Sequence, residues 1–408
     1  MEKAFNLSAY FYAFSIALFP FLSSVALGVF IAASIFLLIK EKKWFGESIH
    51  GGLLLFSVLF FMYVIYVPFS LEINRGFKII SRILPIVVIP ILISIPRIAN
   101  KLKRLNISVA FILGVTLSCL VSLLLALITF FKTGNDFSSF FYYNLSSYMH
   151  LHPTYYSLYI LCAIILLKDD TLPLITLRFK LSIALLFTIF LILLETKMAI
   201  LIFFLLISIF LIKSFGNWKG IFAVALLFSL VLGITYSTNY NLRVKELFKD
   251  RESLNIGNFE EDGVSQRIWL WTKTVDQIKE KPLLGYGVES QKTIFRWKIE
   301  KELLKDELVD FSFAEAAKRI ATKNLHNQYL QILYEFGLVG LFLFLISVLF
   351  LFFLALKRKN YVFLSVYIIF LLFLITENLL YRQMGIYFYS FMLPYLFIKH
   401  NTLKVNIG

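Results

Sequence analysis

The chain has 408 residues, of which 59% are apolar and only 16% are charged, and its mean hydropathy is +0.80. Soluble domains carry about 25% charged residues, so this composition excludes a soluble globular protein and predicts a polytopic membrane protein. The formal charge of +15 does not indicate a nucleic-acid-binding protein, because many of the lysines and arginines lie in short loops between apolar runs.

Apolar runs near the length of about 20 residues that crosses a bilayer recur along the chain, and we expect each to be a helix. The runs before a long polar segment are Phe5–Pro20, Leu22–Ile39, Gly51–Pro68, Lys78–Ile95, Ile107–Phe130, Thr154–Leu167, Lys180–Leu194, Lys197–Ile212 and Gly220–Tyr236. The runs after it are Leu338–Leu356, Tyr361–Ile375 and Gly385–Ile398. The sequence therefore predicts an all-α membrane protein with about twelve transmembrane helices.

Cations follow alternate spans, as the positive-inside rule requires of cytoplasmic loops. They come after spans two, four, six and ten: Lys40, Lys42, Lys43, Arg97, Lys101, Lys103, Arg104, Lys168, Arg178, Lys180, Lys357, Arg358 and Lys359. This pattern predicts cytoplasmic termini and places the long polar segment outside. A multi-pass protein of the bacterial inner membrane is expected, with this segment in the periplasm. We expect a retained first helix, because no small-residue cleavage site precedes the second span.

The chain divides into an N-terminal bundle at residues 1–236, a polar loop at 237–325, and an amphipathic helix with the last spans at 326–408. Cys119 and Cys162 both fall in predicted spans, which favours packing roles over a disulfide or a thiolate metal site. The loop is too small and too polar for an independent core. We therefore expect it to pack against the membrane domain.

Helix signals recur within the loop. Ser265 is expected to cap a helix through Ile278, and Pro282 with the glycines that follow it ends this helix in a turn. Two further helices are expected at Thr293–Leu304 and Ser312–Ala321. The loop is thus predicted to be a small helical subdomain.

The loop returns to the membrane at the run HNQYLQILYEFGLVGLFLFL, which His326 opens. Asn327, Gln331 and Glu335 recur every four residues on one face, which predicts an amphipathic helix at the bilayer surface before the span. The positive end of this helix favours a neutral imidazole that can accept a proton. A histidine that only caps or packs against the helix is the structural alternative.

Several motifs resemble those of the O-antigen ligase and polymerase family. The His326 run is similar to the His-Asn pair and the acidic-x-Gly-x-x-Gly-Leu run that close the large periplasmic loop of that family. The segment SQRIWLWTKTVDQIKEKPLLGYGVES is similar to its arginine-bearing loop helix and Pro-Leu-x-Gly-x-Gly turn. HPTYYSLYI around His152, and ENLLYRQMG from Glu377 to Gly385, extend the resemblance. It implies a GT-C-like glycosyltransferase that inverts the anomeric centre and uses no metal or other cofactor.

The resemblance also implies the substrates. The donor would be a glycan on undecaprenyl diphosphate, and the acceptor would be lipid A-core for a ligase or another lipid-linked repeat unit for a polymerase. A departing diphosphate gathers negative charge, which an arginine can contact with two nitrogen donors, and Arg267 is assigned this role. The acceptor hydroxyl must lose a proton, and His326 is assigned as its general base. Arg267 could instead pair with Glu261 or Asp262.

The family has a second basic residue near the outer mouth of its helices, commonly an arginine. Thr196-Lys197 is the nearest match here, although lysine supplies only a point charge, and Arg243 is the other candidate. The remaining candidates for contact with the diphosphate or the sugar are Arg75, Arg82, Asn327, Glu377 and Arg382. Arg82 is expected about one helical turn inside the membrane, where it would contact phosphate or pair with Glu72 or Glu377.

Three alternatives stay open, one of which is a scaffold subunit without catalysis. A metal site at His150 and His152 is conceivable, but the sequence offers no third ligand beside them. A transporter of lipid-linked sugars is less favoured than an enzyme, because the polar residues concentrate in one outer loop rather than at the midplane of repeated halves.

Overall fold

The computed structural model describes residues 2–41, 50–70, 73–168, 176–216, 218–222, 224–225, 263–303 and 311–399. Every regular element among these residues is helical, which confirms the predicted fold class at that level. Six helical stretches are long and apolar enough to cross a membrane: Pro20–Lys40, Gly51–Phe69, Ile73–Ser94, Ile107–Lys132, Lys197–Phe215 and Gln328–Lys357. Most of the predicted span Gly220–Tyr236, and Arg243 after it, lie outside the described residues.

The elements before the loop are α1 (Glu2–Ser15), α2 (Pro20–Glu41), η1 (Gly51–Ser57), α3 (Val58–Tyr66), η2 (Val67–Phe69), α4 (Ile73–Ile83), α5 (Pro85–Ser94), α6 (Pro96–Arg104), α7 (Ile107–Lys132), η3 (Phe137–Phe140), α8 (Tyr142–Ser147), α9 (Pro153–Leu167), α10 (Leu177–Leu193) and α11 (Lys197–Phe215). The loop contains α14 (Gly263–Ile278), η5 (Ser290–Lys292), α15 (Ile294–Leu303) and α16 (Phe311–Ala321). The elements after it are α17 (Gln328–Lys357), α18 (Tyr361–Phe373), η6 (Leu379–Tyr381), α19 (Gln383–Tyr387), the π-helical turn η7 (Phe388–Met392) and α20 (Leu393–Lys399).

Prolines set several helix boundaries differently from the expectation. Pro20 begins α2 instead of ending the first span, because a proline fits the first helical turn, where its missing amide hydrogen costs nothing. The predicted span Lys78–Ile95 is likewise divided into α4 and α5, and Pro85 starts the second piece. Leu84 between them keeps helical angles, with φ −49° and ψ −37°, so α4 is the amphipathic part of the single stretch Ile73–Ser94.

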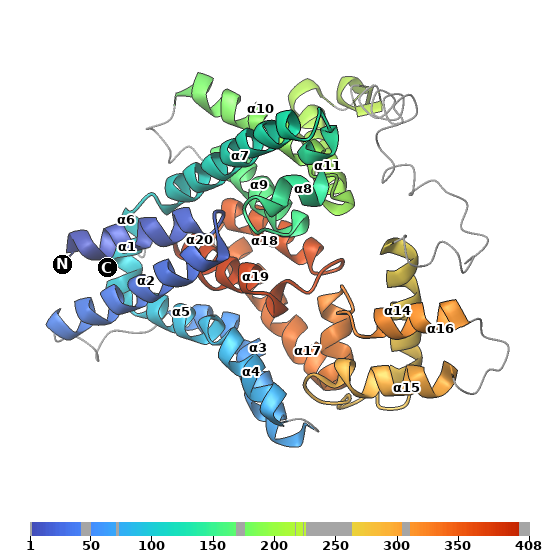
Figure 1. Cartoon of the computed structure of the whole chain (residues 1–408). Coiled ribbons are helices and arrows are strands. Elements are labelled where there is room, and N and C mark those ends of the chain that lie inside the picture. Colours follow the sequence, from blue (N-terminus) through green and yellow to red (C-terminus); the bar gives the residue numbers. More distant parts are fainter. Residues whose placement is uncertain are drawn as a thin grey trace.

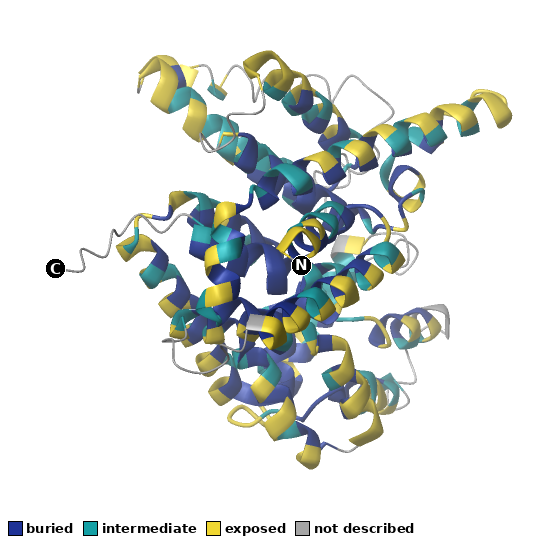
Figure 2. Ribbon diagram, turned by 90° about the vertical axis from the view of Figure 1, so that its left-hand side faces the viewer, coloured by how far each residue is buried: buried dark blue, intermediate teal, exposed yellow. Residues whose placement is uncertain are grey.

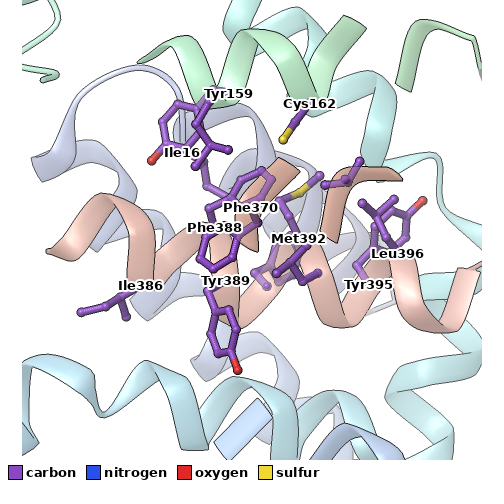
Figure 3. Packing of buried hydrophobic residues seen from close by; sticks show 14 of the residues in the cluster. Ile16, Tyr159, Cys162, Phe370, Ile386, Phe388, Tyr389, Met392, Tyr395 and Leu396 are labelled. Atoms are coloured by element: carbon purple, nitrogen blue, oxygen red, sulfur yellow. The ribbon is translucent and has the colours of Figure 1, made fainter. Parts of the chain in front are cut away.

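The last helical run, from α19 through η7 to α20, forms the centre of the membrane bundle. Nearly all of its residues from Gly385 to Ile398 are buried, as expected for a helix that is apolar on every side. Figure 3 shows Phe388 and Met392 packed among Phe370 of α18 and Cys162 of α9. Both cysteines are free and buried, so the predicted packing role is confirmed. Exposed residues lie mainly on the outer faces of the surrounding helices (Figure 2).

Lys101 and Lys103, which are predicted to be cytoplasmic, and the described helices of the polar loop lie at opposite ends of the molecule. At one end Lys101 pairs with Glu2 at 2.8 Å, and Lys399 Nζ donates to the carbonyl oxygen of Lys103 at 2.7 Å, so α1, α6 and α20 meet there. The loop helices α14, α15 and α16 lie at the other end (Figure 1). This arrangement agrees with the alternation of basic loops in the sequence.

The loop is a small helical subdomain whose core is completed by the membrane domain. Its helices bury Leu270, Phe295, Ile299 and Ile320 against one another, and Tyr334 of α17 lies in the same cluster. The predicted loop helices are present within one or two residues, except that α14 begins at Gly263. The prediction that Ser265 caps this helix is therefore wrong, because Ser265 lies inside its first turn.

The turn after α14 is joined to a break in α17. Gly337 interrupts the helix with φ 65° and ψ −166°, which releases backbone groups on either side of it. The backbone N atoms of Tyr286 and Gly287 in the turn donate to the carbonyl oxygens of Tyr334 and Glu335, both at 2.9 Å. The backbone N atoms of Leu338 and Val339 in α17 donate to the carbonyl oxygens of Pro282 and Leu283 in the turn, at 2.8 and 3.2 Å. The Pro-Leu-x-Gly-x-Gly turn and the Glu-x-Gly run thus form one backbone joint.

The polar face of the first part of α17 turns into the protein. Gln331 and Glu335 are buried, so the predicted position at the bilayer surface is wrong for this face. The buried carboxylate of Glu335 accepts hydrogen bonds from Tyr63 Oη (2.9 Å), Gln331 Nε2 (2.8 Å) and the backbone N of Glu289 (3.1 Å). These donors satisfy the buried oxygens and connect α3, α17 and the loop.

Gly337→Ala should destabilise the protein. A Cβ at this position would lie 2.3 Å from the backbone of Leu283, and its φ and ψ fall in a region that only glycine occupies readily, at a cost of about 1–3 kcal/mol. The measurement is thermal unfolding in detergent with a thiol-reactive dye, which reaches Cys119 and Cys162 only on unfolding. Gly28→Ala is the control, because a Cβ there meets nothing within 4 Å. Equal unfolding temperatures for both variants would contradict the proposed importance of the joint.

Candidate active site

A buried carboxylate brings the two leading candidates of the sequence together. Glu377 lies after α18, and its side chain is only 5% exposed. His326 Nδ1 lies 3.1 Å from Glu377 Oε1 and 3.2 Å from Oε2. A terminal guanidinium nitrogen of Arg267 lies 3.6 Å from Oε2. His326 and Arg267, 59 residues apart in the sequence, therefore share one carboxylate at the loop end of the bundle.

Hydrogen bonds at the start of α17 fix the position of His326. Asn327 caps the helix, because its side-chain oxygen accepts from the backbone N of Leu330 at 3.0 Å. The backbone N of Gln328 donates to the carbonyl oxygen of Leu374 at 2.8 Å, and Gln328 Oε1 accepts from the backbone N of Leu380 at 3.0 Å. Both contacts clamp the segment that carries Glu377. His326 itself has φ 51°, in the left-handed region of the backbone.

The carboxylate orients the imidazole of His326. An ionised carboxylate can only accept hydrogen bonds, so its position beside Nδ1 favours the tautomer that carries the proton on Nδ1. Nε2 is then the nitrogen that can accept a proton, and the ring is 26% exposed. This is the pairing that catalytic histidines commonly use, with a buried carboxylate that stabilises the imidazolium once it forms.

The charge of Glu377 is stabilised by its basic neighbours. Burial alone raises the pKa of this carboxyl, but the hydrogen bond and charge of His326, with further contributions from His152 and Arg267, lower the pKa below its ordinary value. Glu377 is therefore ionised at neutral pH. Its negative charge holds two potential cations within one cluster.

Arg267 is brought to this cluster by the orientation of α14. Trp271 lies one helical turn after Arg267. Its Nε1 donates to the carbonyl oxygen of Leu325, the residue before His326, at 2.7 Å. The alternative partners of Arg267 considered above, Glu261 and Asp262, lie outside the described residues. Glu377 was expected to orient a sugar, to pair with Arg382 and Gln383, or to pair with Arg82. Its contact with both His326 and Arg267 was missed.

His152 extends the cluster from the opposite helix. It caps α9, with Nδ1 accepting from the backbone N of Thr154 at 3.2 Å. Burial is the main cause that lowers the pKa of His152, to about 4; the charge of Glu377 opposes this shift, whereas those of His326 and Arg267 add to it. His152 is thus neutral in the physiological range. His150 lies against the ring of Phe19, with the two ring centroids 6.1 Å apart.

The other candidate substrate-binding residues lie at the start of α11, just after η6 and on α4. Lys197 begins α11 beside Thr196, whose hydroxyl donates to Ser157 Oγ of α9 at 2.8 Å, five residues beyond His152. Arg382 is exposed just after η6. Arg75 and Arg82 lie on the exposed face of α4, with the Arg82 guanidinium 5.5 Å from the centroid of the Tyr381 ring. No ion pair between Arg82 and Glu377 is found among the described residues, where Glu377 contacts His326 and Arg267, and Glu72 lies outside them.

The middle of the chain matches a known protein family. Residues 182–345 match the family model described as O-antigen ligase, which takes in α10, α11, the loop helices and the first part of α17. Lys197, Arg267 and His326 fall within the match, whereas His152 and Glu377 lie outside it. No curated protein matches the chain.

His152→Asn should reduce the acid sensitivity of the folded protein. Between about pH 6.5 and the lowered pKa near 4, the unfolded chain binds a proton at His152 that the folded chain does not, so this residue makes stability fall as the pH falls. One such proton contributes up to about 1.4 kcal/mol per pH unit. Asparagine keeps the helix cap but does not titrate. Thermal unfolding across this pH range should show a shallower loss for the variant, and identical slopes would contradict the burial of His152.

Proposed function

We propose that this chain, whose residues 182–345 match the O-antigen ligase family, is a membrane glycosyltransferase that moves a glycan from undecaprenyl diphosphate to lipid A-core. The single observation that carries the proposal is the contact of both His326 and Arg267 with the buried carboxylate of Glu377. A proton acceptor and a permanent cation are the two groups that such a transfer needs. The loop end of the bundle would face the periplasm of the bacterial inner membrane, and the basic end would face the cytoplasm.

His326 would act as the general base. Its Nε2 takes the proton from the acceptor hydroxyl while the oxygen of that hydroxyl bonds to the anomeric carbon of the donor. The bond between that carbon and the diphosphate oxygen breaks on the opposite side, so the anomeric configuration is inverted. Glu377 stabilises the imidazolium that forms, and the proton later leaves to solvent.

Arg267 would stabilise the leaving diphosphate. Its 3.6 Å separation from Glu377 is longer than a charge-assisted hydrogen bond, so the planar guanidinium can still donate to two phosphate oxygens. Negative charge grows on these oxygens as the glycosidic bond breaks, and a fixed cation there lowers the barrier. Lys197, at the start of α11, would supply a second positive charge to the diphosphate.

A polymerase that joins lipid-linked repeat units is the second candidate. Both reactions need the same base and the same cation, so the contacts around Glu377 support either of them. The acceptor that a purified enzyme uses distinguishes the two. A transporter is less well supported, because the polar cluster lies at the loop end of the bundle, and the polar loop itself carries Arg267.

His326→Asn should slow transfer by about a hundredfold or more, which is the range expected when a general base is lost. Asparagine tolerates the left-handed backbone of this position and can still donate a hydrogen bond to Glu377, but it cannot accept the proton. The measurement is product formation by the purified protein from a lipid-linked glycan, with and without lipid A-core. Glycan on lipid A-core would identify a ligase, and longer lipid-linked chains without it would identify a polymerase.

Lys279→Gln is the control for this experiment. Lys279 is an exposed residue of the loop, 70% accessible, and pairs only locally with Asp276. It should retain the wild-type rate. A folded His326→Asn protein that transfers glycan at the wild-type rate would exclude the general-base role.

A further inference from the structure

A second cationic site lies between the amphipathic helix α4 and the loop subdomain. It is a pocket of about 400 Å³, within the size range of pockets that bind small molecules. The described residues that line it include five cations and one carboxylate: Arg75, Lys78, Arg82, Lys292, Arg296 and Glu289. Arg296 also pairs with Glu300 at 2.8 Å and Lys292 pairs with Glu289 at 2.9 Å, but the cations still outnumber the carboxylates.

The spacing of the cations in α4 places them on one face of the helix. Arg75, Lys78 and Arg82 are spaced by three and four residues, so they share the exposed face of the helix. The adjacent face is buried, and a Cβ at Gly76 would lie 2.7 Å from the side chain of Val67, so α4 packs tightly against the preceding turn. Three positive charges are therefore held on one rigid surface.

The loop contributes both cations and an unusual hydrogen-bond acceptor. Glu289 is only 4% exposed, and its Oε2 pairs with Lys292 Nζ at 2.9 Å. Its Oε1 is buried without a hydrogen-bond partner among the described residues. An unsatisfied buried carboxylate oxygen is costly, and a hydroxyl donor from a ligand would satisfy it.

These features together select a class of ligand. Several cations around one pocket favour a phosphate group, which arginine contacts with two donors and lysine contacts as a point charge. The vacant acceptor of Glu289 favours a hydroxyl in the same molecule. A sugar that carries a phosphate group supplies both, whereas a bare polyprenyl diphosphate has no hydroxyl for Glu289.

Tyr381 links this pocket to the candidate active site. Its hydroxyl accepts from Lys292 Nζ at 3.2 Å, and its ring lies under Lys292 and Arg82 at 5.1 and 5.5 Å. Tyr381 lies in η6, four residues after Glu377. One short segment thus contacts the His326 and Arg267 cluster at its start and two cations of the pocket at its end.

We propose that this pocket binds a phosphate-bearing sugar of the acceptor, and so holds the acceptor glycan beside His326. The leaving diphosphate requires cations at the reacting carbon, which is the role proposed for Arg267, so the positive charge of the pocket can serve a second anionic group. The assignment to the acceptor rests on the proposed function. The binding of a sugar phosphate to the pocket does not depend on the proposed function.

Lysine footprinting of the purified full chain tests the binding. Glucose 6-phosphate should slow acylation of Lys78 and Lys292 by about tenfold when its concentration is about ten times its dissociation constant. Glucose should not slow it, and the loop residues Lys279 and Lys301, which do not line the pocket, should be unaffected. Mass spectrometry reports each lysine separately. His326→Asn should show the same protection, so a failure of the transfer proposal would leave this result intact.

Variants and competing probes complete the test. Arg75→Gln combined with Arg82→Gln should abolish the protection, whereas Arg178→Gln, an exposed arginine of α10, should not. Two outcomes would overturn the proposal. Protection by farnesyl diphosphate but not by glucose 6-phosphate would assign the pocket to the donor diphosphate. Equal protection by inorganic phosphate and glucose 6-phosphate would show binding of anions without recognition of a sugar. If the double variant is unfolded, the wild-type footprint still decides.

Discussion

The arrangement of the candidate site depends on the backbone joint at Gly337. A transmembrane helix normally satisfies its own amides and carbonyls, so it offers no groups to a loop that packs beside it. The break at Gly337 releases such groups, and the turn from Pro282 to Gly287 pairs with them in both directions. The buried carboxylate of Glu335 adds side-chain contacts from α3 and α17. The loop is thereby fixed to the bundle by directional bonds, which sets the position of α14.

That position has an electrostatic consequence. Glu377 is buried, and an isolated buried carboxylate would be too costly to remain charged. Arg267 and His326 offset this cost, but each reaches Glu377 from a different element, α14 and the start of α17. The loop, the helix start and the segment after α18 are therefore interdependent. A charge cluster of this kind stabilises the folded loop and fixes the orientation of the imidazole through Nδ1.

Sequence analysis recovered the parts of the site but not their contacts. The helical class and the loop helices followed from periodicity and from helix-end signals. Arg267 and His326 were selected through motifs that resemble those of a family, and their roles stay predictions. Glu377 was recognised as a candidate, yet its partners could not be inferred, because a carboxylate 51 residues after His326 meets it only through the packing of α17 and α18. Glu289, Lys292 and Arg296 were not singled out, since charged residues in a polar loop carry no local signal of a shared pocket. The polar face of Gln331 and Glu335 was placed at the membrane surface for a similar reason: amphipathic periodicity shows which residues share a face, but not whether water or protein covers it.

The central claim is that the imidazole of His326 removes a proton from the acceptor. Chemical rescue of His326→Gly tests it most directly, because glycine accepts the left-handed backbone at this position and leaves a space beside Glu377 for a small base. In a purified transfer assay, the account predicts that added imidazoles restore activity and that the restored rate rises with the basicity of the imidazole. A folded variant that binds donor and acceptor but is not restored by any imidazole, or that needs none, would contradict the claim.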